Sequence, residues 1–149
     1  MSTYTEKVGS QLNNILERTY DAEKGYLKAA ENVADSNLKN YFKKKAQERY
    51  DFGHALKSEI KQYNQDVDKG DSFASKAHRS WMDVKEWFSA DSEEAMLEEA
   101  IKGEKAAIEQ YEEVLDETNL PPSTETLLTQ QKNKIVGGLE HIKKLEDLA

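Results

Sequence analysis

The sequence contains no cysteine and only two prolines and seven glycines in its 149 residues. Without cysteine the chain has no disulfide, no thiolate nucleophile and no cysteine-ligated zinc or iron–sulfur site. Because proline and glycine are scarce, few positions interrupt a helix, and charged residues supply 34% of the chain. This composition predicts long helices with solvent-exposed polar faces, in a single domain over residues 1–149.

Long apolar runs and an excess of basic charge are also missing. No segment is apolar over the length of a membrane span, and the start of the chain, MSTYTEKVGS, lacks the apolar core of a signal peptide. The net charge of −8 disfavours binding to nucleic acid or to an anionic membrane surface. We therefore expect a cytoplasmic protein with neither nucleic-acid nor membrane partners.

Apolar residues recur at helical spacing in four long segments. The expected helices run from Lys7 to Ala34, from Ser36 to Tyr63, from Asp91-Ser92 to Glu117 and from Ser123 to Leu148. The pair Asp35-Ser36 supplies a break and an N-cap for the second helix, and Ser123, after two prolines, caps the fourth. The expected inward stripes include Thr19, Glu23, Tyr26 and Leu27 in the first helix and Lys45, Arg49, Phe52 and Leu56 in the second.

A long connection separates the second and third helices, from Asn64 to Ala90. Its later part, Ser72–Phe88, has its own helical spacing and predicts a short helix packed through Trp81 and Trp87. The other two connections are short, so each joins a pair of helices into an antiparallel hairpin. Two hairpins joined by a long crossover predict an all-α, ferritin-like four-helix bundle.

A carboxylate stands in the apolar stripe of the third helix, within GEKAAIEQY (Gly103–Tyr111). Glu104, Ala107 and Tyr111 share a helix face with the apolar Leu97. A carboxylate in a bundle core needs a metal ion or a cationic partner to remain charged. The stretch therefore marks a candidate site in the bundle core.

This element resembles the third helix of ferritin-like di-iron proteins. In that superfamily two helices each supply a Glu followed by a small residue and a Tyr, and the other two each supply Glu-x-x-His. The resemblance places the ligand positions on Thr19, Arg49, Phe52, Glu104, Gly138 and His141, with Tyr26 and Tyr111 beside them. Only Glu104 and His141 are residue types that bind iron. We therefore predict a degenerate di-metal site with no cofactor.

One alternative retains a metal in the core. Glu23 also lies near the centre of the first stripe, so a site for iron or manganese would use Glu23, Glu104 and His141. We favour a Glu23 that lies at the edge of the bundle or pairs with a cation. Two or three ligands would not hold the pair of metal ions that a ferritin-like oxidase requires.

Asp51 and His54 have the Asp-x-x-His spacing of a metal-binding pair. On a helix they lie roughly opposite the stripe that contains Phe52 and Leu56. Turning them inward would expose both apolar side chains, at about 2 kcal/mol each. We therefore expect Asp51 and His54 on the surface.

A narrower resemblance extends over nearly the whole chain. Its parts are LNN…E…D…GY in the first helix (Leu12, Asn13, Glu17, Asp21, Gly25, Tyr26), AHRSWMDVK in the crossover, GE…Y in the third helix and EHI…L in the fourth. Together they resemble a bacterial ferritin-like four-helix-bundle family of unknown function, which implies no agreed activity. His78, Arg79 and Trp81 either pack the crossover onto the bundle, which we favour, or form a patch for a ligand or partner.

Arg49 is the expected partner of Glu104, since it occupies a vacated ligand position that faces helix three across the core. A guanidinium can meet a carboxylate through two hydrogen bonds, and Tyr26, Tyr111 or His141 would contact the remaining polar atoms. The hypothesis is thus a buried ion pair where related bundles hold iron.

These observations favour a non-catalytic bundle that acts through oligomerisation or binding, with a stress response as one setting, and most simply as a homodimer. The first alternative is a metal-binding oxidase or iron-handling protein. The second is a carrier that holds a small molecule in the bundle core. The sequence does not name the protein or small molecule that would be bound.

Overall fold

The computed structural model describes residues 4–63, 93–117 and 119–148, and all regular structure in these ranges is α-helical. The helices are α1 (Tyr4–Asn32), α2 (Ser36–Gln62), α5 (Glu93–Glu117) and α6 (Pro122–Leu148). The all-α four-helix bundle is therefore confirmed, with helix bounds close to those expected. The crossover helix expected at Ser72–Phe88 lies outside the described residues. Within those residues no helix has an apolar stretch that would span a bilayer.

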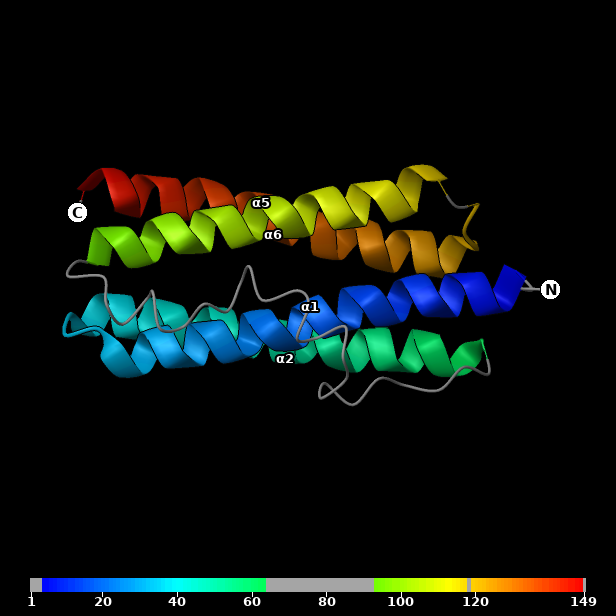
Figure 1. The fold of residues 1–149 in the computed structure, drawn as a ribbon, viewed down its shortest axis with the longest axis horizontal. Helices are drawn as coiled ribbons and strands as arrows, with labels where there is room; N and C mark the ends of the chain where they lie inside the picture. Colours follow the sequence, from blue (N-terminus) through cyan, green and yellow to red (C-terminus); the bar gives the residue numbers. More distant parts are fainter. Residues whose placement is uncertain (1–3, 64–92, 118, 149) are drawn as a thin grey trace.

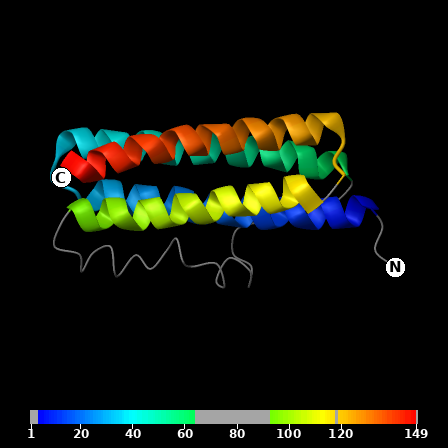
Figure 2. The same cartoon turned by 90° about the horizontal axis from the view of Figure 1, so that it is seen from above.

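The four helices form long, nearly parallel rods arranged as two hairpins (Figure 1). In this view α1 runs from right to left and α2 returns, whereas α5 runs from left to right and α6 returns. The end of α2 and the start of α5 therefore lie at opposite ends of the bundle, and these helices run in the same direction. Figure 2 shows α1 beside α5 and α2 beside α6. The hairpins approach each other more closely along α1 and α5 than along α2 and α6.

Residues at the helix ends direct the chain from one helix into the next. Asp35 has extended backbone angles, φ −68° and ψ 122°, and its carboxylate accepts hydrogen bonds from the N–H groups of Asn37 and Leu38. This is the N-cap expected for α2. By contrast, α6 begins at Pro122, one residue before the expected start at Ser123. Proline suits this first position, where the missing N–H would have had no helical acceptor.

A chain of hydrogen bonds joins the last turns of α2 to the first turn of α6. Thr124 Oγ1 donates to Glu59 Oε2 at 2.8 Å, and the Tyr63 hydroxyl lies 2.6 Å from the same Thr124 oxygen. Thr124 and Glu59 are both buried. The Glu59 carboxylate thus lies near a helix N-terminus, where the helix dipole stabilises negative charge. The contact ties the two hairpins together at this end of the bundle.

Two apolar clusters fill the interior, one toward each end of the bundle. Tyr26, Phe42, Leu97 and Ile142 belong to the cluster near the α1–α2 connection, and Leu16, Phe52, Leu56, Tyr111 and Leu128 belong to the other. Between the clusters, each helix contributes a residue that is polar or lacks a side chain: Thr19, Arg49, Glu104 and Gly138. We call this level the polar layer. It divides the core near mid-length.

The buried face of α1 differs from the expected stripe. Leu27, expected inside, is 45% exposed, whereas Glu17 and Asp21, outside that stripe, are buried. Because α1 packs against both α2 and α5, its buried face is wider than the single stripe that the spacing predicts. The expected position of Leu27 was therefore wrong.

Candidate functional site

The polar layer contains the ion pair expected from the sequence. The Arg49 guanidinium donates through Nη2 to Glu104 Oε1, across the core from α2 to α5. The Arg49 side chain is 2% exposed and the Glu104 side chain is fully buried. Their two charges therefore compensate each other in an environment that solvates neither.

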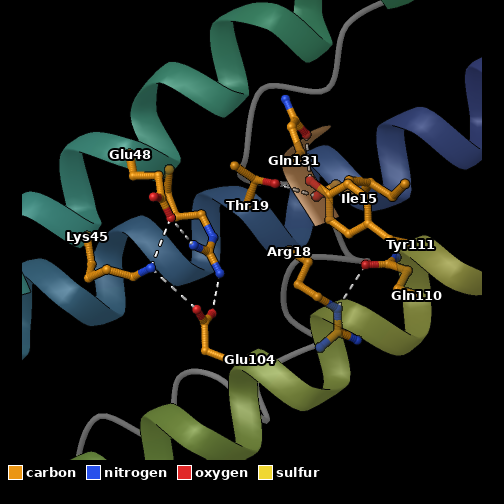
Figure 3. A network of polar contacts seen from close by, with 10 residues as sticks. Ile15, Arg18, Thr19, Lys45, Glu48, Glu104, Gln110, Tyr111 and Gln131 are labelled. Carbon is orange, nitrogen blue, oxygen red and sulfur yellow. Dashed lines mark hydrogen bonds and ion pairs between the residues drawn. The ribbon is translucent and has the colours of Figure 1, made fainter. Parts of the chain in front are cut away.

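Two further charges complete a quartet around this pair. Lys45 Nζ lies 3.7 Å from Glu104 Oε2 and donates to Glu48 Oε1 at 3.0 Å. Arg49 Nη1 donates to the same Glu48 oxygen at 3.0 Å. Figure 3 shows the Lys45 ammonium of α2 directed toward Glu104 of α5, with the Glu48 carboxylate on its other side. We call Lys45, Glu48, Arg49 and Glu104 the charge quartet. It holds two cations and two carboxylates, so its net charge is zero when all four groups are ionised.

Two aromatic rings flank the Arg49 guanidinium. Its central carbon lies 5.9 Å from the centroid of the Tyr26 ring and 5.5 Å from that of Phe52, at distances where ring and cation attract. Burial is the largest single effect and lowers the pKa of Arg49, but Glu104, Tyr26, Glu48 and Tyr111 together raise it more, so the net shift is upward. Arg49 therefore stays charged in the core.

Burial has the opposite effect on Glu104. It raises the pKa of this carboxyl group above its ordinary value of 4.5, against the lowering effects of Arg49 and Lys45. Glu48 raises this pKa a little further, and the Tyr26 hydroxyl, which faces the Glu104 carboxylate, lowers it. Glu104 thus depends on both neighbouring cations to remain ionised.

Gly138 provides the space in which the Lys45 ammonium lies. A Cβ atom at Gly138 would overlap Lys45 Nζ, and it would lie 3.6 Å from Lys45 Cε and 4.0 Å from Glu104 Oε2. The neighbouring Gly137 has no such neighbour, since nothing lies within 4 Å of the corresponding position. The missing side chain at Gly138 therefore has a definite role, which is to admit a second cation to the quartet.

A second hydrogen-bonded group lies beside the quartet, toward the apolar cluster that contains Leu16 and Leu56. The Tyr111 hydroxyl donates to Gln131 Oε1 at 2.6 Å, and Gln131 Nε2 donates to the Phe52 carbonyl at 3.3 Å. Thr19 donates to the Ile15 carbonyl at 2.8 Å within α1. Figure 3 shows Thr19, Tyr111 and Gln131 close together. Burial raises the pKa of Tyr111, so its hydroxyl remains protonated and acts as a donor.

The space left in the core at this level is small. A cavity of about 10 Å³ lies among Thr19, Arg49, Tyr111 and Arg18, and Arg18 Nε donates to Gln110 at its edge at 2.9 Å. Such a volume is roughly the minimum that one water molecule occupies. As the helices are packed in this structure, the core has no room for an organic ligand beside Thr19.

Several candidate residues lie away from the quartet. His141 is exposed and packs on the Tyr41 ring at 5.2 Å between centroids. The buried stripe of α6 passes through Ile135 and Ile142, and one residue's rotation of about 100° places His141 on the surface. Glu23 is half-buried at the α1–α2 edge, where burial raises its pKa and the nearby Lys57 lowers it.

The remaining candidates were the Asp-x-x-His pair in α2 and the three crossover residues that could form a patch. Asp51 and His54 are both exposed, as expected. His54 packs edge-on against Tyr50 with 4.6 Å between ring centroids, and Asp51 accepts a hydrogen bond from Gln47. His78, Arg79 and Trp81 lie outside the described residues.

Sequence reasoning missed Glu48 and Gln131 as members of this region. Glu48 is 28% exposed, so it does not belong to the inward stripe of α2, and it joins the quartet from the edge. Gln131 is buried between Tyr111 and Phe52. A polar residue at the inward spacing of α6, four positions before Ile135, was the signal that would have identified it.

The residues of the polar layer do not fit a di-metal centre. An ammonium and a guanidinium stand against Glu104, and both groups repel a metal cation. In the described ranges, no three His, Asp or Glu side chains are grouped in a way that could hold a metal ion. The chemistry of this donor set is that of a balanced ion cluster.

Comparison with known proteins identifies a family for this arrangement. Residues 7–117 match the family described as "Domain of unknown function (DUF2383)". The match includes nearly all of α1 and the whole of α2 and α5, and therefore three members of the polar layer, Thr19, Arg49 and Glu104. No curated protein matches the sequence. The chain belongs to the DUF2383 family, whose function is unknown.

Proposed function

We propose that this protein is a ferritin-like bundle in which the charge quartet replaces the di-metal centre, and that it acts by binding rather than by metal chemistry. The observation that supports this most directly is the ion pair of Arg49 with Glu104. The pair lies near mid-length of the bundle, and it includes Glu104, the carboxylate whose sequence context resembles the third-helix ligand of ferritin-like di-iron proteins.

The direction of the helices supports the ferritin-like connectivity. Because α2 and α5 run the same way and begin at the same end, α2 ends at the opposite end of the bundle from the start of α5. A hairpin, a long return and a second hairpin form the connectivity of ferritin-like folds. The position of the polar layer near mid-length agrees with a centre built from all four helices.

The quartet also favours a non-catalytic role. Each of its charged groups is engaged by another member: Glu48 by Lys45 and Arg49, and Glu104 by the same two cations. A general base or nucleophile needs a group that is free to react with a substrate. The cavity of about 10 Å³ beside Arg49 does not admit one. Because the core offers neither a free reactive group nor space for a substrate, we propose that binding takes place on the outer surface of the bundle.

A metal-rescue experiment tests both parts of the proposal. Arg49→Glu would bring a new carboxylate to Glu104 and Glu48 and so restore an acidic site. We expect this variant to melt at a lower temperature than the wild type and to regain stability with millimolar Mn(II), because the ion would neutralise the cluster. Arg49→Gln is the matched control, and neither it nor the wild type should respond to Mn(II).

Two outcomes would contradict the proposal. Near-stoichiometric iron or manganese in wild-type protein, purified without a chelator or a metal-affinity column, would restore the hypothesis of an oxidase or iron-handling protein. Absence of Mn(II) rescue in Arg49→Glu would show that this position does not correspond to a ferritin-like ligand.

Self-association is the second part of the proposed role. We expect a homodimer, as the wide apolar helix faces suggest, and light scattering at tens of micromolar protein would measure its mass. A monomer mass under these conditions would leave binding of another molecule as the remaining role.

A further inference from the structure

A groove lies on the outer surface between α2 and α6, along the seam where the two hairpins approach each other least. Its volume is about 480 Å³, which falls in the range of small-molecule sites, roughly 300–1,000 Å³. Phe52, Glu48 and Gln131 line it, and the same three residues contact the quartet or Tyr111 on their inner side. The groove floor is therefore held in place by the polar layer.

The chemistry of the groove changes along its length. Lys44 of α2 and Lys134 of α6 line one end, and Ala55 and Leu127 line the other. Because α2 and α6 run in opposite directions, residues early in α2 lie opposite residues late in α6. The separation of Lys44 and Ala55 along α2 is about 16 Å at the helical rise per residue. The groove thus has its two lysines toward one end, apolar side chains at the other, and the carboxylates of Glu48 and Asp51 along α2 between them.

The two lysines are not neutralised by the protein. In the part of the chain that the structure describes, neither Lys44 nor Lys134 forms an ion pair, and Lys134 instead lies 6.0 Å from the centroid of the Phe52 ring. Of the two carboxylates in the groove, Glu48 is paired with the cations Lys45 and Arg49. Asp51 accepts a hydrogen bond from the neutral amide of Gln47 at 3.1 Å.

We propose that this groove binds a small amphiphilic anion, a carboxylate attached to an apolar chain or ring. The carboxylate would lie between Lys44 and Lys134, and the apolar part would extend past Phe52 toward Ala55 and Leu127. Charge complementarity at one end and apolar burial at the other then add along a single molecule. This ligand class rests on the binding role proposed above and makes it specific.

The difference between the lysine end and the apolar end of the groove argues against a second copy of the chain as its occupant. A two-fold contact pairs each surface patch with itself in reverse. Reversal would place the lysines of one copy against the apolar end of the other, where they lose water without gaining a carboxylate. An asymmetric ligand with one charged end meets both ends of the groove favourably.

Calorimetric titration of the folded wild-type protein with decanoate, below its micelle concentration, tests this proposal. We expect saturable binding of one decanoate per chain, at least tenfold tighter than binding of butanoate, since the shorter chain does not reach the apolar end. Decanol and decyltrimethylammonium should each bind at least tenfold more weakly than decanoate, because they lack the anionic group.

Paired variants locate the site. Lys44→Gln with Lys134→Gln should weaken decanoate binding at least tenfold. The control, Lys43→Gln with Lys105→Gln, makes the same change in net charge at exposed lysines outside the groove and should leave the affinity within twofold. Equal loss in both double variants would overturn the proposal, as would equal affinity for decanol.

Two further results would also overturn it. One is the absence of saturable binding to a wild-type protein whose melting curve shows that it is folded. The other is an increase in mass by light scattering that accounts for the heat, which would indicate assembly driven by a surfactant. The Mn(II) experiment on Arg49→Glu is unaffected by any of these results, so failure of the ligand proposal is distinguishable from failure of the metal-free interior.

Discussion

The ammonium group of Lys45 occupies the space that a side chain at position 138 would fill. The missing side chain of Gly138 lets a cation from α2 reach Glu104. Two residues on different helices, a glycine and a lysine, thus act together at one point of the core. This relationship gives a direct test of how the layer is built.

Alanine at the two adjacent glycines of α6 separates helix propensity from packing. Gly137→Ala meets no neighbour, so it should stabilise the protein by about 1 kcal/mol, the usual difference between the two residues in a helix. Gly138→Ala gains the same propensity but must displace the Lys45 ammonium. We expect its melting temperature to be lower than that of Gly137→Ala.

The Lys45→Met background provides the control for this comparison. Without the ammonium group, Gly138→Ala should become as stabilising as Gly137→Ala in urea unfolding experiments. A difference that persists in this background would show that the backbone of α6, and not Lys45, opposes the new methyl group.

Arg49→Met should make stability depend on pH. Burial already raises the pKa of Glu104 above its ordinary value of 4.5, and removal of Arg49 would raise it further. A carboxyl group with a raised pKa in the folded state contributes its full stability below pH 4.5, and that contribution is lost as the pH rises through the folded-state pKa. Near pH 7 we expect Arg49→Met to be about 3–5 kcal/mol less stable than the wild type.

The double variant Arg49→Met with Glu104→Gln tests the cause of that loss. It leaves Lys45 and Glu48, one charge of each sign, so it should recover much of the stability at neutral pH and lose the added pH dependence. Urea unfolding of the wild type, both single variants and the double variant from pH 4 to 8 measures this. A double variant less stable than Arg49→Met at pH 8 would contradict the pairing.

Thr124→Val removes the hydroxyl group that links α2 to α6. Glu59 would lose its hydrogen-bond donor while remaining buried, so we expect a loss of roughly 1–3 kcal/mol in the free energy of unfolding. Ser123→Ala, at the exposed position where a cap was expected, should change it by less than about 0.5 kcal/mol. The opposite order would restore Ser123 as the cap.

Gln131 and His141 give a similar contrast later in α6. Gln131→Leu removes the acceptor of the Tyr111 hydroxyl and should cost roughly 1–3 kcal/mol because that hydroxyl is buried. His141→Ala affects only an exposed contact with Tyr41, and surface changes of this kind usually fall within about 0.5 kcal/mol. Thermal melts of the two variants should therefore differ clearly. A larger loss in His141→Ala would place this histidine in the core.

The helices could be predicted from the sequence because they rest on local periodicity. Apolar spacing placed Arg49 and Glu104 on inward faces, and the resemblance to di-iron bundles, which puts both at ligand positions, led to their pairing. A cap at Asp35-Ser36 followed from residue type alone. These features require no knowledge of how the helices rotate relative to one another.

The positions of the other site residues depend on how the helices are rotated about their axes, which the sequence does not determine. His141 and Gly138 share a face of α6 by spacing, yet α6 is turned so that Ile142 is buried and His141 is exposed. Glu48 lies at the edge of the stripe of α2, where periodicity does not decide between solvent and a neighbouring cation. The space beside Gly138, which Lys45 fills, is a property of two helices together and has no signature within either one.

The balanced charge of the quartet has a consequence for how such a protein evolves. Replacing any one of Lys45, Glu48, Arg49 or Glu104 by a neutral residue leaves an excess charge in or beside the core, whereas replacing a cation and an anion together does not. Lineages of this family should therefore change these positions in compensating pairs. The four residues therefore form a single heritable unit, whose charge stays balanced only when a cation and an anion change together.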